Sequence, residues 1–433
     1  MSWSVKYHFL SQKQRRNAVK ENDMFHKPTR SKYTTLQQIC KLIPSGLVDK
    51  IAQTVGVDKK ARTFRPWSHV VALLYTQLVH AMSLNDVCDS LRHHAARLFT
   101  NRGATAPKRN TFSHANRTRD PRMAETLFWN VLDHLVRLFP GFGGRTYQVL
   151  PRRFKRVINV VDASTIALVA NCMDWAKHRR KKAAAKLHLR LDLQSFLPSC
   201  VIIDTAREHD ATRARDLCAN LGAGEIVIFD KAYLDFAHLA ELTERGVSWV
   251  TRAKSNMKAR CVKRLIKKPH GRILRDDLIV LTGTKSAGYY PGVLRRVVAL
   301  VDLNGTDTVM TFISNNTEWA ASSIADLYKS RWSIEVFFKE IKQTLQLCDF
   351  LGHNKNAILW QIWTAPLLYV LLRFLAFMHR WQYGFKRFFC ILRSCVWDCY
   401  DLGNLIKSCG TAGDPVRLLA MPQQAYLPGF GPP

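Results

Sequence analysis

The sequence predicts a mixed α/β protein whose first third is helical. Short runs rich in β-branched residues, at 157–162 and 225–230, have the length and composition of buried strands. Residues 34–142 instead repeat apolar positions at helical spacing, and a stretch rich in Gly and Pro at 140–151 predicts a domain boundary. The chain of 433 residues, 47% of them hydrophobic, is long enough for roughly two or three domains.

The chain is strongly basic. Lys and Arg number 65 against 33 Asp and Glu, which gives a formal net charge of +32. Such a charge indicates a polyanionic partner, with nucleic acid as the first candidate and an anionic membrane surface as the second. The amino-terminal residues lack the charged start, apolar core and cleavage site of a secretory signal, so we expect a cytoplasmic protein.

Cysteine usage favours reduced thiols over a disulfide framework. The eleven cysteines are scattered through apolar surroundings, where a free thiol packs as a small hydrophobe. Cys390, Cys395 and Cys399 lie close together, but their spacing is not that of a zinc pair and histidines at ligand spacing are missing. Core packing is therefore favoured over metal binding.

Residues 1–33 form a polar, basic extension, and 34–142 predict a separable helical DNA-binding domain. Ser83, with Asp86 three residues later, marks the start of one helix. The segment 107–119 resembles the second helix of a helix-turn-helix pair. Its cations, which include Lys108 and Arg109, could meet phosphates. The side chains available for base edges are Asn110, Ser113, Asn116 and Arg117. A basic surface helix without base contacts explains the pattern equally well.

Two of the predicted strands end in an acidic residue. The run 157–162 ends at Asp162, and the run 225–230 ends at Asp230. Ligands of open sheets tend to bind outside the carboxyl ends of strands. Two aspartates placed there, joined by a glutamate from a helix, could hold hard cations through oxygen ligands.

Other segments of the second half are basic or strand-forming. The run 177–182 is placed to hold DNA by its phosphates, and strands outnumber helices between 246 and 315. The segment 358–377 is apolar and nearly long enough to span a membrane, but Arg373 and Pro366 favour a buried core helix. The tail from 409 to 433 is expected to be irregular.

The segment 328–342 places polar residues at helical spacing. At about 100° per residue, Tyr328, Arg331 and Lys342 all come within roughly 40° of Glu335. One carboxylate, two cations and a phenol would then share a face, which predicts an active-site helix. A solvated amphipathic face has the same pattern.

The spacing Tyr328-x2-Arg331-x3-Glu335-x6-Lys342 resembles the signature of DDE transposases of insertion-sequence family four, and the similarity extends from about 34 to about 405. The resemblance implies a ribonuclease H-like catalytic domain at 155–408 with a β-rich insertion at about 246–315, preceded by the helical DNA-binding domain and followed by C-terminal helices. One departure is that Lys231-Ala232-Tyr233 follows Asp230, where the family has Arg-Gly-Tyr.

The resemblance also implies chemistry and partners. Asp162, Asp230 and Glu335 would be catalytic acids that bind Mg²⁺, for which Mn²⁺ can substitute, in a two-metal mechanism. The enzyme would bind the ends of its insertion sequence as a homodimer on double-stranded DNA, cleave them and join them to target DNA, in association with the nucleoid.

The resemblance assigns DNA contacts as well. Tyr328, Arg331 and Lys342 would contact phosphates near the transposon end. Trp332 would stack on an unpaired base or pack in the core. Two alternatives stay open: a metal-dependent nuclease of the same fold without strand transfer, and a catalytically inactive DNA-binding regulator.

Overall fold

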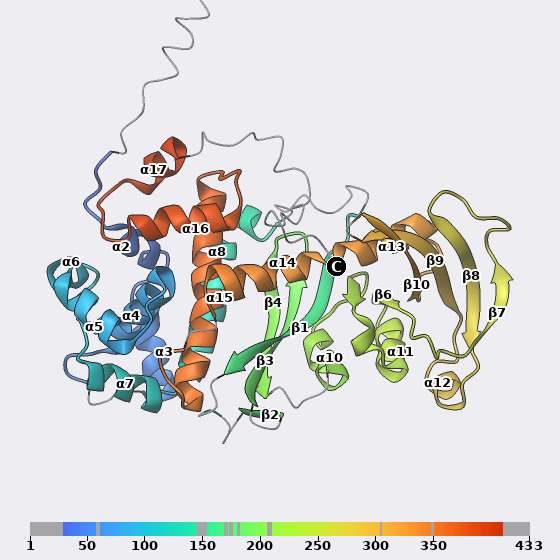
Figure 1. Ribbon diagram of the computed structural model, residues 1–433, viewed down its shortest axis with the longest axis horizontal. Helices are drawn as coiled ribbons and strands as arrows, with labels where there is room; N and C mark the ends of the chain where they lie inside the picture. Colours follow the sequence, from blue (N-terminus) through green and yellow to red (C-terminus); the bar gives the residue numbers. More distant parts are fainter. Residues whose placement is uncertain are drawn as a thin grey trace, which may run out of the picture. The chain divides into compact units, whose positions relative to one another are not determined.

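The computed structural model describes residues 29–57, 61–144, 154–168, 172, 176–179, 182–205, 210–303, 305–347 and 350–409 (Figure 1). They fall into two compact units, one within 41–374 and one formed by the described residues before 41 and after 374. Several sequence predictions lie outside the described residues: most of the extension 1–33, most of the boundary 140–151, the side chains of the basic run 177–182, and nearly all of the tail 409–433.

The larger unit is built around a mixed sheet of ten described strands, which confirms the mixed α/β class. β1 (Ile158–Leu168) runs antiparallel to β3 (Lys182–Asp192) on one side and parallel to β5 (Ile226–Phe229) on the other. β4 (Leu197–Thr205) pairs with β3, and β6 (Ser248–Arg252) pairs in parallel with β5. All four residues of β5 are buried, as is typical of a central parallel strand.

Beyond β6 the sheet continues as antiparallel strands. In spatial order they are β10 (Thr306–Ser314), β9 (Leu294–Leu303), β8 (Ile273–Leu281) and β7 (Ala259–Arg264), while β2 (Lys177–Arg179) pairs with β3. The short helix α12 (Thr284–Tyr289) connects β8 to β9. Strands therefore predominate between 246 and 315, as the sequence predicts. β7 lies at the edge and exposes Arg260, Lys263 and Arg264.

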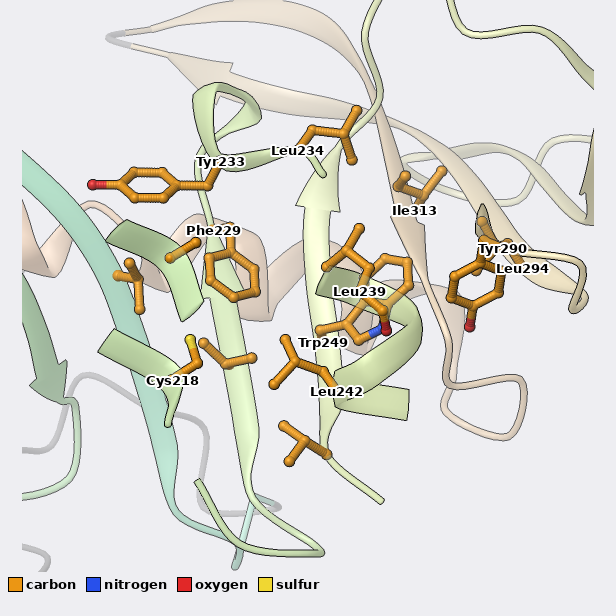
Figure 2. Packing of buried hydrophobic residues seen from close by; sticks show 14 of the residues in the cluster. Cys218, Phe229, Tyr233, Leu234, Leu239, Leu242, Trp249, Tyr290, Leu294 and Ile313 are labelled. Atoms are coloured by element: carbon orange, nitrogen blue, oxygen red, sulfur yellow. The ribbon is translucent and has the colours of Figure 1, made fainter. Parts of the chain in front are cut away.

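One face of the sheet packs against α10 (Asp210–Cys218) and α11 (Phe236–Glu244). Figure 2 shows the buried cluster in which their apolar side chains meet those of β5 and β6. The indole N–H of Trp249 donates to the carbonyl of Leu239 at 3.1 Å. Burying a side chain such as Phe229 contributes roughly 1.5–3 kcal/mol, so this cluster fixes the carboxyl end of β5, where Asp230 follows.

The opposite face of the sheet is covered by α13 (Ala321–Ser330) and α14 (Ser333–Lys339), which follow one another in Figure 1. The Tyr328 ring of α13 packs on Phe312 of β10 with centroids 4.8 Å apart. Because successive strand residues point to opposite faces, and Val161 belongs to the α10 and α11 side, Asp162 points toward α13 and α14.

The segment 328–342 is not one helix, so that part of the sequence prediction is wrong. α13 ends at Ser330, and the N–H groups of residues 331, 332, 334 and 335 each bond three residues back, which tightens the turn. After α14 the backbone widens into a π-helix, η4 (Glu340–Thr344), where the N–H of Leu345 bonds the carbonyl of Glu340 at 2.9 Å. A uniform 100° per residue therefore does not hold between Glu335 and Lys342.

The described residues between 41 and 142 are mainly helical, as the sequence predicts. Ser83 begins its helix as expected, because its hydroxyl accepts from the N–H of Asp86 at 3.2 Å. The helices are α3 (Leu47–Val55), α4 (Pro66–Val79), α5 (Leu84–His93), α6 (Ala95–Phe99), α7 (Arg109–Thr118) and α8 (Arg122–Leu138), followed by the 3₁₀ turn η1 (Pro140–Phe142).

These helices share a core with α15 (Lys355–Met378). The Trp360 indole N–H donates to the carbonyl of Arg119 at 3.0 Å, and its ring lies 4.6 Å from that of His69. Trp363 packs on Phe128 at 5.6 Å. Within the described residues, α15 is long and apolar enough to cross a membrane, but 89% of its most apolar window is buried in the protein, as expected of a core helix.

The smaller unit joins the two ends of the described chain. Its helices are α2 (Thr35–Cys40), α16 (Phe385–Ser394) and α17 (Leu402–Ser408). The N–H of Ser31 donates to the carbonyl of Cys399 at 2.8 Å, and that of Thr35 donates to Asp398 at 3.0 Å. Of the three cysteines with a predicted packing role, Cys395 is buried and Cys399 is half-buried, whereas Cys390 is exposed, so the prediction is wrong for Cys390.

Candidate active site

Two aspartates follow aligned positions of β1 and β5. The parallel register pairs Val161 with Phe229, so Asp162 and Asp230 are the next residues on the two strands. Asp230 follows the end of β5, as predicted. Asp162 does not end its strand, because β1 continues to Leu168 through its pairing with the longer β3.

Arg331 joins one of these aspartates to Glu335. Its Nη1 donates to Asp162 Oδ2 and its Nη2 donates to Glu335 Oε1, both at 2.9 Å. The side chain of Arg331 is only 10% exposed, while that of Glu335 is 56% exposed. The buried Nε of Arg331 has no hydrogen-bond partner within the described part of the chain. The tight turn at 331–335 thus places one guanidinium between an acid of β1 and an acid of α14.

Tyr328 adds a contact to the second aspartate. Its hydroxyl donates to Asp230 Oδ1 at 3.3 Å, and its ring lies 5.7 Å from the guanidinium carbon of Arg331. Five side chains therefore meet here: Asp162, Asp230, Tyr328, Arg331 and Glu335. They come from β1, the end of β5, α13 and α14, and from the turn between these two helices.

Burial controls the protonation of this cluster. It raises the pKa of Asp162 to about 6, with Asp230 and Glu335 adding to the rise, although Arg331 and the N–H of Ala163 oppose it. Burial also raises the pKa of the Tyr328 phenol to about 12. The phenol therefore stays a donor at neutral pH, whereas Asp162 lies near its titration point unless further positive charge is added.

Known proteins with similar sequences identify the family. Residues 153–371, just over half of the chain, match the family described as transposase DDE domain, and this segment includes the whole cluster. A Sinorhizobium fredii protein named as transposase y4zB is 33% identical over 257 residues, which are 59% of this chain and 70% of the relative. Transposase InsG of insertion sequence element IS4, from Escherichia coli K12, is 23% identical over 198 residues, or 44% and 43% of the two chains. The chain belongs to the DDE transposases of insertion-sequence family four.

Other similarities cover more of this transposase. A Geobacillus stearothermophilus protein, named as a transposase for insertion sequence element IS5377, is 28% identical over 348 residues, covering 80% of this chain and 86% of the relative. Residues 31–100 match a family described only as a domain of unknown function. Among solved structures, a piggyBac transposase in a synaptic complex with hairpin DNA aligns at a TM-score of 0.45 and 12% identity, covering 90% of this chain and 86% of that one.

As a DDE transposase the protein is an enzyme that acts on DNA and depends on a divalent metal. The donor set suits such an ion, because three carboxylates supply the oxygen ligands that hard cations prefer. Among the described residues, however, no three His, Cys, Asp or Glu side chains lie close enough together to share one ion. Arg331 lies between Asp162 and Glu335, so the acids would hold a metal only after its guanidinium moves aside.

Two further predicted site residues lie on the same stretch of the chain. Trp332 is half-buried in the turn between α13 and α14. Lys342 is half-buried in η4, where burial lowers its pKa.

The predicted basic helix is present as α7. Lys108, Arg109 and Arg117 are all exposed, as a phosphate contact requires. Asn116, which the sequence places among the side chains for base edges, is instead buried and shares a 2.8 Å hydrogen bond with His69 Nε2. Helical periodicity explains this correction, because Asn116 lies one turn after the buried Phe112.

Sequence reasoning missed Glu340 and the end of η4. Burial raises the pKa of Glu340 to about 7, while Arg373 and Tyr369 of α15 oppose the rise. A signal was present, because an arginine in the apolar run 358–377 requires a nearby acid or an exit to water. Nothing comparable in the sequence marks Gln77 and His80, whose side chains contact the end of η4.

Proposed function

We propose that this transposase binds the ends of its insertion sequence, cleaves phosphodiester bonds there and joins the ends to target DNA. The observation that carries the proposal is the meeting of Asp162, Asp230 and Glu335, from three separate elements, with Arg331 and Tyr328. Phosphoryl transfer depends on positioning and charge neutralisation more than on covalent help, and this cluster offers both.

The strand order supports a ribonuclease H-like catalytic core within 155–408. β4, β3 and β1 are antiparallel, and β5 and β6 follow in parallel, with acids on β1 and after β5. β7 to β10 fall between Asp230 and Glu335 in the chain, in agreement with a β-rich insertion at about 246–315. The helical region 34–142 would supply DNA binding.

Asp162, Asp230 and Glu335 would hold Mg²⁺, or Mn²⁺ in its place. When bound, two such ions would activate the attacking oxygen and stabilise the leaving oxygen of an in-line displacement. Tyr328 orients Asp230 through its hydroxyl. Arg331 neutralises Asp162 and Glu335 until the acids take a metal, and its guanidinium would then be free for a DNA phosphate.

DNA would meet the protein at two places. Near the acids the contacts would be Tyr328, Arg331, Lys342 and Trp332. On α7 they would be Lys108, Arg109 and Arg117, all exposed. The net charge of +32 favours such binding. A homodimer in the end complex, in the cytoplasm on the nucleoid, completes the proposal.

An assay with labelled DNA from both ends of the insertion sequence tests this function. With Mg²⁺ and target plasmid, purified protein should release the ends and join them to the plasmid. Cleaved ends without joined product would make the protein a nuclease. Binding without cleavage would make it a regulator.

A further inference from the structure

The segment that carries Glu335 is held at its far end by α4. α14 continues directly into η4, so Glu335 and Thr344 belong to one helical segment. The last carbonyls of a helix lack partners within it. Here Gln77 Nε2 donates to the carbonyl of Leu345, and His80 Nε2 donates to the carbonyl of Thr344 at 2.9 Å.

Both donors are built into the end of α4. Gln77 is 6% exposed in the last turn. His80 caps the helix with φ at 59°, in the left-handed region that favours glycine at this position. A residue with a Cβ atom destabilises this conformation relative to glycine. Histidine at position 80 therefore does not stabilise the backbone of the cap. What the imidazole adds is its hydrogen bond to η4.

The other end of α4 contacts α7. His69, in the first turn, shares the 2.8 Å hydrogen bond with Asn116, and burial lowers the pKa of His69 to about 3, so the ring is neutral. His69 and Gln77 are eight residues apart, which is about 12 Å along a helix. α4 thus connects the basic helix α7 with the end of the Glu335 segment.

We propose that Gln77 and His80 are positioning residues, which fix the π-helical end of the Glu335 segment and so hold Glu335 in place opposite Asp162 and Asp230. The proposal rests on the proposed catalytic function of these three acids. Loss of either donor removes the partner that a carbonyl of the segment has among the described residues, which lets η4 change its winding and shifts α14. A displacement of about 1 Å far from the chemistry can cost roughly 100-fold in rate.

The test uses the full chain with Gln77→Ala and His80→Gly. The glycine variant removes the imidazole but suits the positive φ, so it keeps its fold. Thr76→Ala is the matched control, because the Thr76 hydroxyl donates to the carbonyl of Ala72 within its own helix. His80→Gln tests rescue, since an amide N–H can also donate to the Thr344 carbonyl.

Two measurements are made on each variant. Hydrogen exchange without DNA should become at least about tenfold faster at amides 340–347 and stay unchanged in β5. Single-turnover cleavage by the assembled end complex should fall about 10- to 100-fold, with the affinity for end DNA within about threefold. His80→Gln should recover most of the cleavage rate.

The outcomes separate this proposal from the function on which it rests. If the unchanged protein cleaves no end DNA, the proposed function fails, while the exchange data still report whether α4 fixes η4. If it cleaves, and both variants cleave as fast as Thr76→Ala, the positioning role is overturned. Faster exchange without slower cleavage, or no rescue by glutamine, overturns it too.

Discussion

Arg331 decides the charge balance of the active site, because one buried guanidinium serves both Asp162 and Glu335. Arg331→Ala leaves two carboxylates without a counter-ion, so the melting temperature without metal should fall. Added Mn²⁺ should then raise it by several degrees more than in the unchanged protein, since the ion replaces the missing charge. Differential scanning calorimetry with and without Mn²⁺ measures both effects.

Arg117→Ala is the matched control for the Mn²⁺ measurement alone, because it removes the same charge from an exposed position on α7. If Arg331 also contacts a DNA phosphate, Arg331→Ala should lower the slope of log affinity against log salt by about one unit. Equal Mn²⁺-induced shifts in the two variants would show that Arg331 does not compete with the metal.

Asp162 makes metal binding depend on pH. Its pKa is raised by burial from 3.8 to about 6, so a proton competes with the metal below that pH. Mn²⁺ affinity should rise with pH up to about 6 and then level off, with a limiting slope of about tenfold per unit below it. The free energy of unfolding should instead decrease with pH. The native state binds the Asp162 proton more tightly than the unfolded state does, and this contribution to stability is lost as the pH rises from about 4 to 6. Mn²⁺ titration followed by electron paramagnetic resonance measures this rise of affinity with pH, which should be absent in Asp162→Asn.

At the scale of elements, η4 carries a buried acid whose cost depends on pH. Burial raises the pKa of Glu340 from 4.5 to about 7, so the native state prefers the protonated carboxyl. Stability from this group is full below about pH 4.5 and is lost as the pH rises through about 7. Glu340→Gln should therefore gain about 1–3 kcal/mol of unfolding free energy relative to the unchanged protein between those pH values.

Denaturant unfolding at several pH values measures this gain. The exposed Glu244→Gln serves as control and should show no such trend. The unfolding free energies of Glu340→Gln and the unchanged protein could instead differ by the same amount at every pH in that range. Glu340 would then ionise in the native state without loss of stability.

The sequence predicts the helices and strands better than it predicts where they end and how they connect. Asp230 could be placed because a short apolar run with an acid at its end reads as a buried strand. The extension of β1 past Asp162 could not, because it depends on pairing with β3. The spacing of residues 328–342 brings Arg331 and Glu335 together correctly, since they are four residues apart. The winding between Glu335 and Lys342 differs from the prediction, because the backbone there forms the π-helix η4, in which Glu340 is half-buried near Arg373 and Tyr369 of α15.

At the scale of the larger unit, the helical region shares its core with α15. α4 is buried along nearly its whole length, and Trp360 and Trp363 of α15 pack against His69 and Phe128. An isolated fragment 34–142 would expose this surface, so we expect it to unfold without a cooperative transition. Near-ultraviolet circular dichroism during heating checks this expectation. A fragment that melts cooperatively and binds end DNA as tightly as the full chain would contradict it and confirm the separable domain that the sequence predicts.

The central claim is that Asp162, Asp230 and Glu335 form one metal-dependent catalytic site. The most direct measurement is single-turnover cleavage of end DNA in Mg²⁺ by Asp162→Asn, Asp230→Asn and Glu335→Gln, beside the exposed Asp133→Asn as control. Each site variant should lose at least about 1,000-fold in rate, because the carboxylates hold the charge on which the reaction depends, while end affinity stays within about threefold. Cleavage within about tenfold of the unchanged protein in any one of the three would remove that residue from the site and contradict the account.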